Sequence, residues 1–186
     1  GVKKYREYYK DKGLFENSVY PGIHEMVAAL KKAGVHLTVA TSKPEVYSVQ
    51  IMEKFGLAQY FDFICGSNLD ETRSKKAEVI RYGLEKNGNP PLDQVLMIGD
   101  RMHDVEGAKE TGIKCAGVLF GYGNREELEN AGFNAADFGT LVHAYLEAPA
   151  IGISAEEFQP PVKLFYFAEY TTAPLACQVI FPYSGK

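Results

Sequence analysis

The fold of this chain is decided by the stretch VLMIGDRMHD, residues 95–104. Residues 95–98 are apolar without interruption, Asp100 follows them after a single glycine, and Asp104 lies one helical turn further on. A continuous apolar run is typical of a strand that is covered on both faces, as in the parallel sheets of α/β proteins. Ligands of such sheets bind at the carboxyl ends of the strands, so the two carboxylates mark a candidate site.

Helical and strand-like segments alternate on both sides of this stretch, which predicts an α/β, Rossmann-like parallel sheet with helices on both faces. Upstream we expect helices over residues 21–34, 41–56 and 76–86, and strands over residues 36–40 and 61–65. Downstream we expect a helix over 104–111, a strand over 115–120 and a short helix over 125–130. In the helix that begins at residues 41–44, one face is formed by Val46, Val49, Met52 and Phe55.

Composition excludes several classes of protein. The 186 residues are 46% hydrophobic and 24% charged, which is typical of a globular protein and excludes collagen-like and wholly disordered chains. A net charge of -4 argues against nucleic acid as a partner, and no apolar run is long enough to span a membrane. The three scattered cysteines form no C-x-x-C pair, so we expect neither a disulfide framework nor a zinc site, and we expect a cytoplasmic location. The oligomeric state stays open.

Polar residues follow two of the expected strands. Thr41 and Ser42 come directly after the strand over 36–40, and Asp100 comes after the apolar run. Two carboxylates near a helix start suit Mg²⁺, which prefers oxygen ligands and keeps several waters. The alternative is that Asp100 only caps the following helix, as an aspartate at such a position often does. Lys75 and Lys76 begin another helix, where lysines usually face water.

Four strings, taken in their order along the chain, give these residues a family context. They are VHLTVATSKP at 35–44, TRSKKAEVI at 72–80, VLMIGDRMHDVEGAKETGI at 95–113 and GVLFGYGNREELENAGFNAADF at 117–138. This succession resembles the haloacid dehalogenase superfamily of phosphohydrolases, most closely its phosphoglycolate phosphatase and β-phosphoglucomutase-like branch. The resemblance covers roughly residues 15–147.

The resemblance implies a Mg²⁺-dependent phosphatase whose substrate is a small phosphorylated metabolite such as phosphoglycolate. It implies that Thr41 hydrogen-bonds the transferring phosphoryl group and that Ser42 offers a backbone N–H to it. It also implies that Lys76 neutralises the developing charge, with Lys75 as the alternative if the register slips by one residue. Phosphoryl transfer depends mainly on positioning and on electrostatic stabilisation, so these residue types suit the chemistry.

The resemblance further implies that Asp100 ligates Mg²⁺ and that Asp104 supports the metal directly or through water. One element of the family pattern has no counterpart. The family's nucleophile comes from an Asp-x-Asp string after the first strand, and no two aspartates of this sequence are separated by a single residue. We therefore expect the sequence to lack the nucleophile, the first and central strand of the sheet, and most of the cap domain.

The expected organisation has three parts. Residues 1–20 resemble the end of a cap domain and its return linker, residues 21–147 form the core, and residues 148–186 form a tail rich in proline and aromatic residues. The tail has possible strands at 162–170 and 175–181 and no assigned role. The alternative to a fragment of a phosphatase is a non-catalytic binding or regulatory module of the same fold, in which the tail supplies replacement strands.

Overall fold

The computed structural model describes residue 8, residues 13–20, 22–70, 72–118 and 121–132, and the backbone of Leu164–Phe167. In chain order its elements are α2 (Ile23–Lys32), β1 (His36–Pro44), α3 (Glu45–Lys54), β2 (Phe63–Ser67), α4 (Lys76–Lys86), β3 (Val95–Gly99), α5 (Met102–Thr111), β4 (Lys114–Gly117), α6 (Arg125–Asn130) and β5 (Leu164–Phe167). Short 3-10 helices lie at Gly13–Phe15, Ala58–Tyr60 and Leu92–Gln94.

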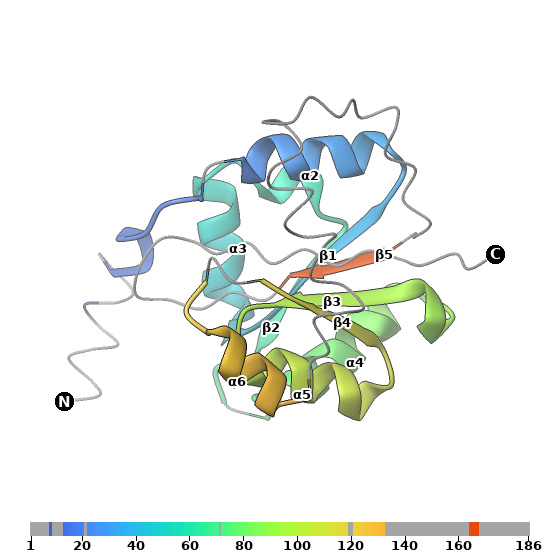
Figure 1. Ribbon diagram of the computed structural model, residues 1–186. Coiled ribbons are helices and arrows are strands. Elements are labelled where there is room, and N and C mark those ends of the chain that lie inside the picture. The colour runs from blue at the N-terminus through green and yellow to red at the C-terminus, as the bar shows by residue number, and fades with distance from the viewer. Residues whose placement is uncertain are drawn as a thin grey trace.

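Five strands of the described part form one sheet in the order β2-β1-β5-β3-β4, and every neighbouring pair is parallel. Figure 1 shows α2 and α3 above the sheet in its view and α4, α5 and α6 below it. All carboxyl ends therefore meet at one edge of the sheet. This arrangement confirms the predicted α/β class with a parallel sheet between two layers of helices.

The central position of the sheet is taken by a strand from the tail. β5 pairs with β1 on one side, from His36↔Leu164 to Val39↔Phe167, and with β3 on the other, from Val95↔Leu164 to Ile98↔Phe167. β5 lies within the expected tail strand at 162–170, whereas the expected strand at 175–181 lies outside the described residues. In the described part of the chain, β5 is what joins the β2-β1 pair to the β3-β4 pair.

The apolar core sits around the strands that the sequence marks as buried on both faces. Every residue of β3 is buried, and the stripe of α2 that faces the sheet comprises Ile23, Met26, Val27 and Leu30. On α4 the predicted stripe of Ala77, Ile80 and Leu84 is buried as well. None of the described helices is both long and apolar enough to cross a membrane.

The predicted boundary between the first strand and the following helix was wrong. Thr41 and Ser42 do not open a helix, because β1 continues in extended conformation through Pro44 and α3 begins at Glu45. A residue before proline is disfavoured in helical conformation, which keeps Lys43 extended. The inward face of α3 also differs from the prediction, because Ser48, Ile51 and Met52 are buried while Val46 is 46% exposed.

Other boundaries shift by smaller amounts. β2 starts at residue 63 rather than 61, and the Asp62 carboxylate just before it accepts hydrogen bonds from Leu37 N and Lys31 Nζ. α5 starts at Met102, two residues before the predicted 104. β4 starts at Lys114 and ends at Gly117, whereas residues 119 and 120 of the predicted strand lie outside the described residues.

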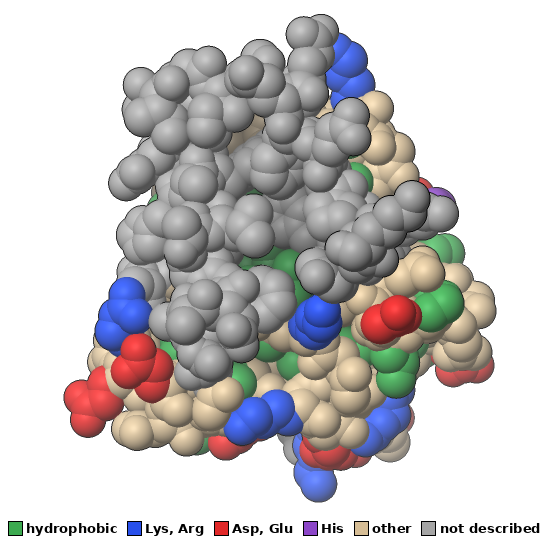
Figure 2. Space-filling view, turned by 45° about the vertical axis from the view of Figure 1, so that its right-hand side comes forward, with side chains coloured by type: hydrophobic (Ala, Val, Ile, Leu, Met, Phe, Trp, Pro, Cys, Tyr) green, Lys and Arg blue, Asp and Glu red, His purple; other side chains and the backbone are tan. Residues whose placement is uncertain are grey.

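The charges on one face of the molecule are mixed in sign. In the lower part of Figure 2, Lys and Arg side chains stand interspersed with Asp and Glu side chains. Phosphate-backbone binding normally needs a clustered basic face. The described residues on this face do not form such a cluster.

Candidate functional site at the carboxyl edge of the sheet

Two of the predicted residues lie at the carboxyl edge because their strands end there. Thr41 belongs to the last part of β1, and Asp100 follows β3 directly. Both are fully buried. The backbone N–H of Lys43 donates to Thr41 Oγ1 at 3.1 Å, which fixes the threonine hydroxyl three residues before the end of β1.

Lys76 connects the β1 end of this edge to α5. Its Nζ donates to the Ala40 carbonyl oxygen at 3.0 Å and lies 2.9 Å from Asp104 Oδ1. The Lys76 and Asp104 side chains are 3% and 0% exposed, so this is a buried ion pair. Lys75, the alternative for the same role, is exposed and precedes the first residue of α4. The helix register therefore places Lys76, and not Lys75, at the edge.

Two glycines make room for the buried pair. A Cβ at Gly107 would lie 2.6 Å from Lys76 Cγ, so the lysine stem runs against bare backbone of α5. A Cβ at Gly99 would overlap the Asp104 side chain, which folds back over the end of β3. Neither glycine was assigned a role from the sequence, although both belong to the string at residues 95–113.

Asp104 also stabilises the start of α5. Its Oδ2 accepts a hydrogen bond from Arg101 N at 3.1 Å, and Arg101 is the N-cap residue. Arg101 Nε and Met102 N both donate to Glu127 Oε1, at 2.7 Å and 2.9 Å, so α6 holds this turn in place. The hydrogen bond from Arg101 holds the pKa of Glu127 below its usual value. Asp100 is not the cap, which removes the capping alternative for that residue.

Asp100 is enclosed by the loop that precedes α6. Tyr122 N donates to Asp100 Oδ2 at 2.6 Å, and a Cβ at Gly121 or at Gly123 would overlap Asp100 atoms. The other carboxylate oxygen, Oδ1, is buried and has no hydrogen-bond partner among the described residues. Burial raises the pKa of Asp100 above its ordinary value, and the Tyr122 hydrogen bond only partly opposes this rise.

The donor set at this edge offers a magnesium ion one carboxylate oxygen that has no described partner. Lys76 supplies one positive charge against the two carboxylates Asp100 and Asp104, and a buried carboxylate oxygen without a partner is costly. A divalent cation on Asp100 Oδ1 would offset that cost. No group of three or more His, Cys, Asp or Glu residues is assembled for a metal in the described ranges. Mg²⁺ needs only one or two carboxylates because it retains waters.

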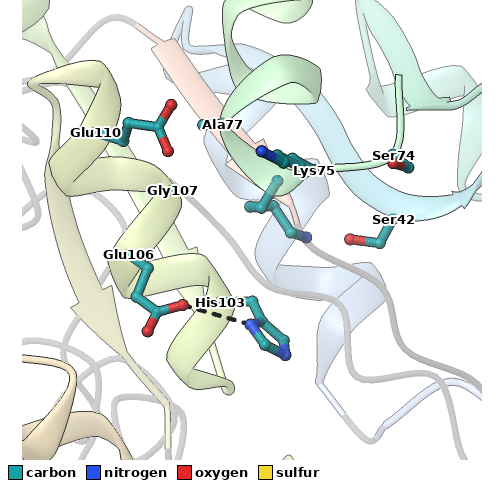
Figure 3. Close-up of a pocket in the computed structure, with 9 residues that line it drawn as sticks. Ser42, Ser74, Lys75, Ala77, His103, Glu106, Gly107 and Glu110 are labelled. Carbon is teal, nitrogen blue, oxygen red and sulfur yellow. Dashed lines mark ion pairs between the residues drawn. The ribbon is translucent and has the colours of Figure 1, made fainter. Parts of the chain in front are cut away.

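A hollow of about 330 Å³ opens beside this edge. It is lined by Ser42 from β1, by Ser74 and Lys75 at the start of α4, and by residues of α5 that include His103 and Glu106 (Figure 3). His103 Nδ1 lies 3.5 Å from Glu106 Oε2. Ser42 therefore lies beside Thr41 with its side chain at the hollow, whereas Thr41 itself is buried.

The two described cysteines are not activated as nucleophiles. Cys65 and Cys115 are free thiols, and Cys177 lies outside the described residues. Burial raises the pKa of the Cys65 thiol to about 12 and raises the pKa of Cys115 still further. The thiolate is the reactive form of cysteine, so neither residue is activated.

The loop over Asp100 yields a stability prediction. Gly123→Ala is expected to lower the free energy of unfolding by about 1–3 kcal/mol, because the new methyl group would overlap the Asp100 carbonyl oxygen. Tyr122→Ala is the matched control, since it keeps the backbone donor to Asp100 and removes a side chain that is 42% exposed. Urea unfolding of both variants checks this, and equal losses would argue against a tight loop.

Known proteins of this architecture place the chain in a family. The model of the family described as haloacid dehalogenase-like hydrolase matches residues 1–118. The chain belongs to this family, which confirms the resemblance in the sequence. A crystal structure of a predicted phosphatase from Clostridium acetobutylicum superposes with a TM-score of 0.70 at 46% identity, over 82% of this chain and 68% of that one.

Curated relatives with several names share this core. A 5'-nucleotidase of Pseudomonas aeruginosa is 46% identical over 127 residues, which are 68% of this chain and 57% of the relative. The tyrosine-protein kinase PtkA of Mycobacterium tuberculosis is 35% identical over 147 residues, which are 79% of this chain and 50% of the relative. Phosphoglycolate phosphatases are also among the relatives, so the chain lies close to that branch. The chain thus spans about half the length of the first of these relatives.

Proposed function

We propose that this chain carries the core of a Mg²⁺-dependent phosphatase that acts on a small phosphomonoester such as phosphoglycolate. The observation that carries the proposal is the buried set at the carboxyl edge, where Lys76 pairs with Asp104 and Asp100 keeps a carboxylate oxygen without a described partner. Phosphoryl transfer asks for positioned charges around a polyanion more than for covalent chemistry by many groups. This edge supplies charges of that kind in a buried setting.

Each residue has a distinct task in the proposal. Thr41 Oγ1, held by Lys43 N, donates its hydroxyl hydrogen to a phosphoryl oxygen, and the Ser42 backbone N–H lies beside it. Lys76 places its ammonium charge where negative charge develops on the phosphoryl group, and Asp104 keeps that ammonium oriented. Asp100 Oδ1 holds the metal. When bound, Mg²⁺ supplies Lewis-acid stabilisation of the phosphoryl oxygens.

The nucleophile is the part of this chemistry that the sequence does not contain. Its aspartates stand at positions 11, 62, 70, 93, 100, 104 and 137, so none forms an Asp-x-Asp string. Asp100 and Asp104 are committed to the metal and to Lys76 in the proposal. We propose that the whole protein supplies the attacking aspartate from a segment outside this sequence, and that these 186 residues alone are inactive.

A second candidate function is a phosphate-binding module without catalysis. The observation that favours it is β5, which fills the centre of the sheet with the chain's own residues 164–167. The core then has a continuous sheet and the same Thr41, Lys76 and Asp100 edge, but no attacking group. An upstream reading frame that encodes a strand and Asp-x-Asp would favour the phosphatase, and a start codon directly before Gly1 would favour the module.

The 186-residue chain is expected to release no product from an activated aryl phosphate in the presence of Mg²⁺. Positioning and charge stabilisation cannot replace an absent nucleophile. The measurement is release of the aryl alcohol over hours from purified chain, with Asp100→Asn as the matched control. Turnover that survives repurification and disappears in Asp100→Asn would show that one of the present residues attacks phosphorus, contrary to the proposal.

A further inference from the structure

Arg73 belongs to the string TRSKKAEVI, three residues before Lys76, and has no role in the proposed chemistry. Its guanidinium is held on three sides. Nε donates to the Gly66 carbonyl oxygen at 2.8 Å, Nη2 donates to Glu45 Oε2 at 3.0 Å, and the guanidinium carbon lies 3.7 Å from the centroid of the Tyr82 ring. The Arg73 side chain is only 18% exposed.

Glu45 completes the arrangement from the first residue of α3. Its Oε2 accepts a second hydrogen bond, from Gly66 N at 3.2 Å, so one carboxylate oxygen binds both the end of β2 and Arg73. Gly66 approaches closely, because a Cβ there would lie 2.5 Å from the Lys43 carbonyl oxygen and 2.6 Å from Glu45 Cα. Arg73, Glu45 and Gly66 thus form a clamp between α3, β2 and the segment before α4.

Glu45 and Arg73, the two charged residues of the clamp, each lie within a few residues of the candidate site in the sequence. Glu45 lies two residues after Lys43, whose backbone N–H donates to Thr41 Oγ1. Arg73 lies three residues before Lys76, whose Nζ donates to the Ala40 carbonyl oxygen. The clamp therefore joins the segment that carries Thr41 to the segment that carries Lys76. Loss of the clamp would remove one of the contacts that hold these two segments together.

We propose that Arg73 and Glu45 are positioning residues that hold Lys76 at the carboxyl edge beside Thr41. The purpose of this positioning rests on the proposed function, whereas the contacts of the clamp do not depend on it. The planar guanidinium gives two directed hydrogen bonds and stacks on Tyr82 at the same time, which the point charge of a lysine cannot do. Neither residue touches the phosphoryl group; each acts through the segment that it holds.

The test measures how well Lys76 is protected from a pulse of acetic anhydride, read residue by residue by mass spectrometry on the full chain. In the wild type Lys76 is buried and the adjacent exposed Lys75 serves as the internal reference. Arg73→Ala is expected to raise the labelling of Lys76 relative to Lys75 by at least about tenfold, because charged hydrogen bonds and a stacked contact are lost together. Arg81→Ala is the matched control, because Arg81 lies on α4 and pairs with Glu110 at an exposed site.

Rescue separates positioning from a general loss of structure. Methylguanidinium, which restores the planar ion in the space left by Arg73→Ala, is expected to return Lys76 toward wild-type protection. In Arg73→Lys, Lys76 is expected to stay as strongly labelled as in Arg73→Ala. Amide hydrogen exchange of β3 should be unchanged in Arg73→Ala, because β3 lies outside the clamp.

Three results would overturn the inference. The first is continued protection of Lys76 in Arg73→Ala, and the second is equal labelling of Lys76 in Arg81→Ala. The third is Lys76 labelling in Arg73→Ala that methylguanidinium does not reverse, together with faster amide exchange in β3. Orthophosphate affinity in the presence of Mg²⁺ keeps the two proposals apart. If Lys76 labelling changes as expected but the chain binds no orthophosphate, the positioning role stands and the proposed function is refuted. If both proposals are right, Arg73→Ala also binds orthophosphate at least about tenfold more weakly than the wild type.

Discussion

Asp100→Asn is expected to lower the Mg²⁺-dependent turnover of a chain with a restored N-terminal Asp-x-Asp strand by about a hundredfold or more. The substitution removes the carboxylate charge whose Oδ1 is buried without a described partner, and a lost metal ligand acts mainly on stabilisation of the transition state. Steady-state kinetics with a generic phosphoester measures the effect. Asp93→Asn, at an exposed aspartate before β3, is the matched control and should leave turnover unchanged.

In the metal-free chain of 186 residues, the same substitution is expected to act on the pH dependence of stability. Because burial raises the pKa of Asp100, the folded state binds a proton more tightly than the unfolded state, and this carboxylate opposes folding at neutral pH. Its contribution to stability therefore improves as the pH falls toward the raised pKa. Asp100→Asn should remove that pH dependence and should not lower the free energy of unfolding. Mg²⁺ should raise the melting temperature of the wild type but not of Asp100→Asn, and equal shifts in both would contradict the metal assignment.

Lys76→Ala is expected to cost about 3–5 kcal/mol of unfolding free energy, because it leaves the buried Asp104 carboxylate without its partner. Lys75→Ala removes a neighbouring lysine that is exposed and should change stability by no more than about 0.5 kcal/mol. Urea unfolding measures both. In the chain with the restored strand, turnover should fall strongly in Lys76→Ala and stay near the wild-type value in Lys75→Ala.

A double variant shows whether the ion pair itself is responsible. Lys76→Met combined with Asp104→Asn removes the ion pair without leaving Asp104 charged and unpaired, so it should recover part of the stability that Lys76→Met alone loses. Stability losses that simply add would show that Lys76 and Asp104 act independently. That result would contradict the contact of 2.9 Å between Lys76 Nζ and Asp104 Oδ1.

The strongest sequence patterns gave the right elements. The apolar run before Asp100 is the fully buried β3, and the helix over residues 76–86 is α4 with the same bounds. These succeed because a strand that is covered on both faces and a helix with one apolar stripe leave clear patterns in the sequence. The predicted end of the first strand was wrong, because Thr and Ser before Lys-Pro also match the start of a helix.

The position of β5 could not be read from its sequence. Residues 164–167 are four apolar and aromatic residues, and such a short run fits many places in a sheet. Their pairing with β1 and β3 joins segments that are more than 60 residues apart in the chain. Local propensity contains no information on a partner at that separation, and so a replacement strand from the tail was only one of the alternatives that the sequence left open.

The candidate site was predicted in outline but not in its contacts. Thr41 and Asp100 were expected after two strands of a parallel sheet, and the strands of such a sheet end at one edge. Lys76 reaches this edge through its hydrogen bond to the Ala40 carbonyl oxygen. The pair between Lys76 and Asp104 depends on the packing of α4 against α5, and the sequence shows only two residues 28 positions apart. The glycines at 99 and 107 were a usable signal, because a glycine inside a strand end or a helix often marks close packing.

The central claim is that Thr41, Lys76 and Asp100 form a binding site for a phosphoryl group and its Mg²⁺ ion. A crystal structure of the 186-residue chain with Mg²⁺ and orthophosphate tests it most directly. We expect the metal about 2.0–2.1 Å from Asp100 Oδ1 and phosphate oxygens within hydrogen-bond distance of Thr41 Oγ1 and Lys76 Nζ. A phosphate bound only in the hollow between Ser74 and His103, or a metal away from Asp100, would contradict the claim.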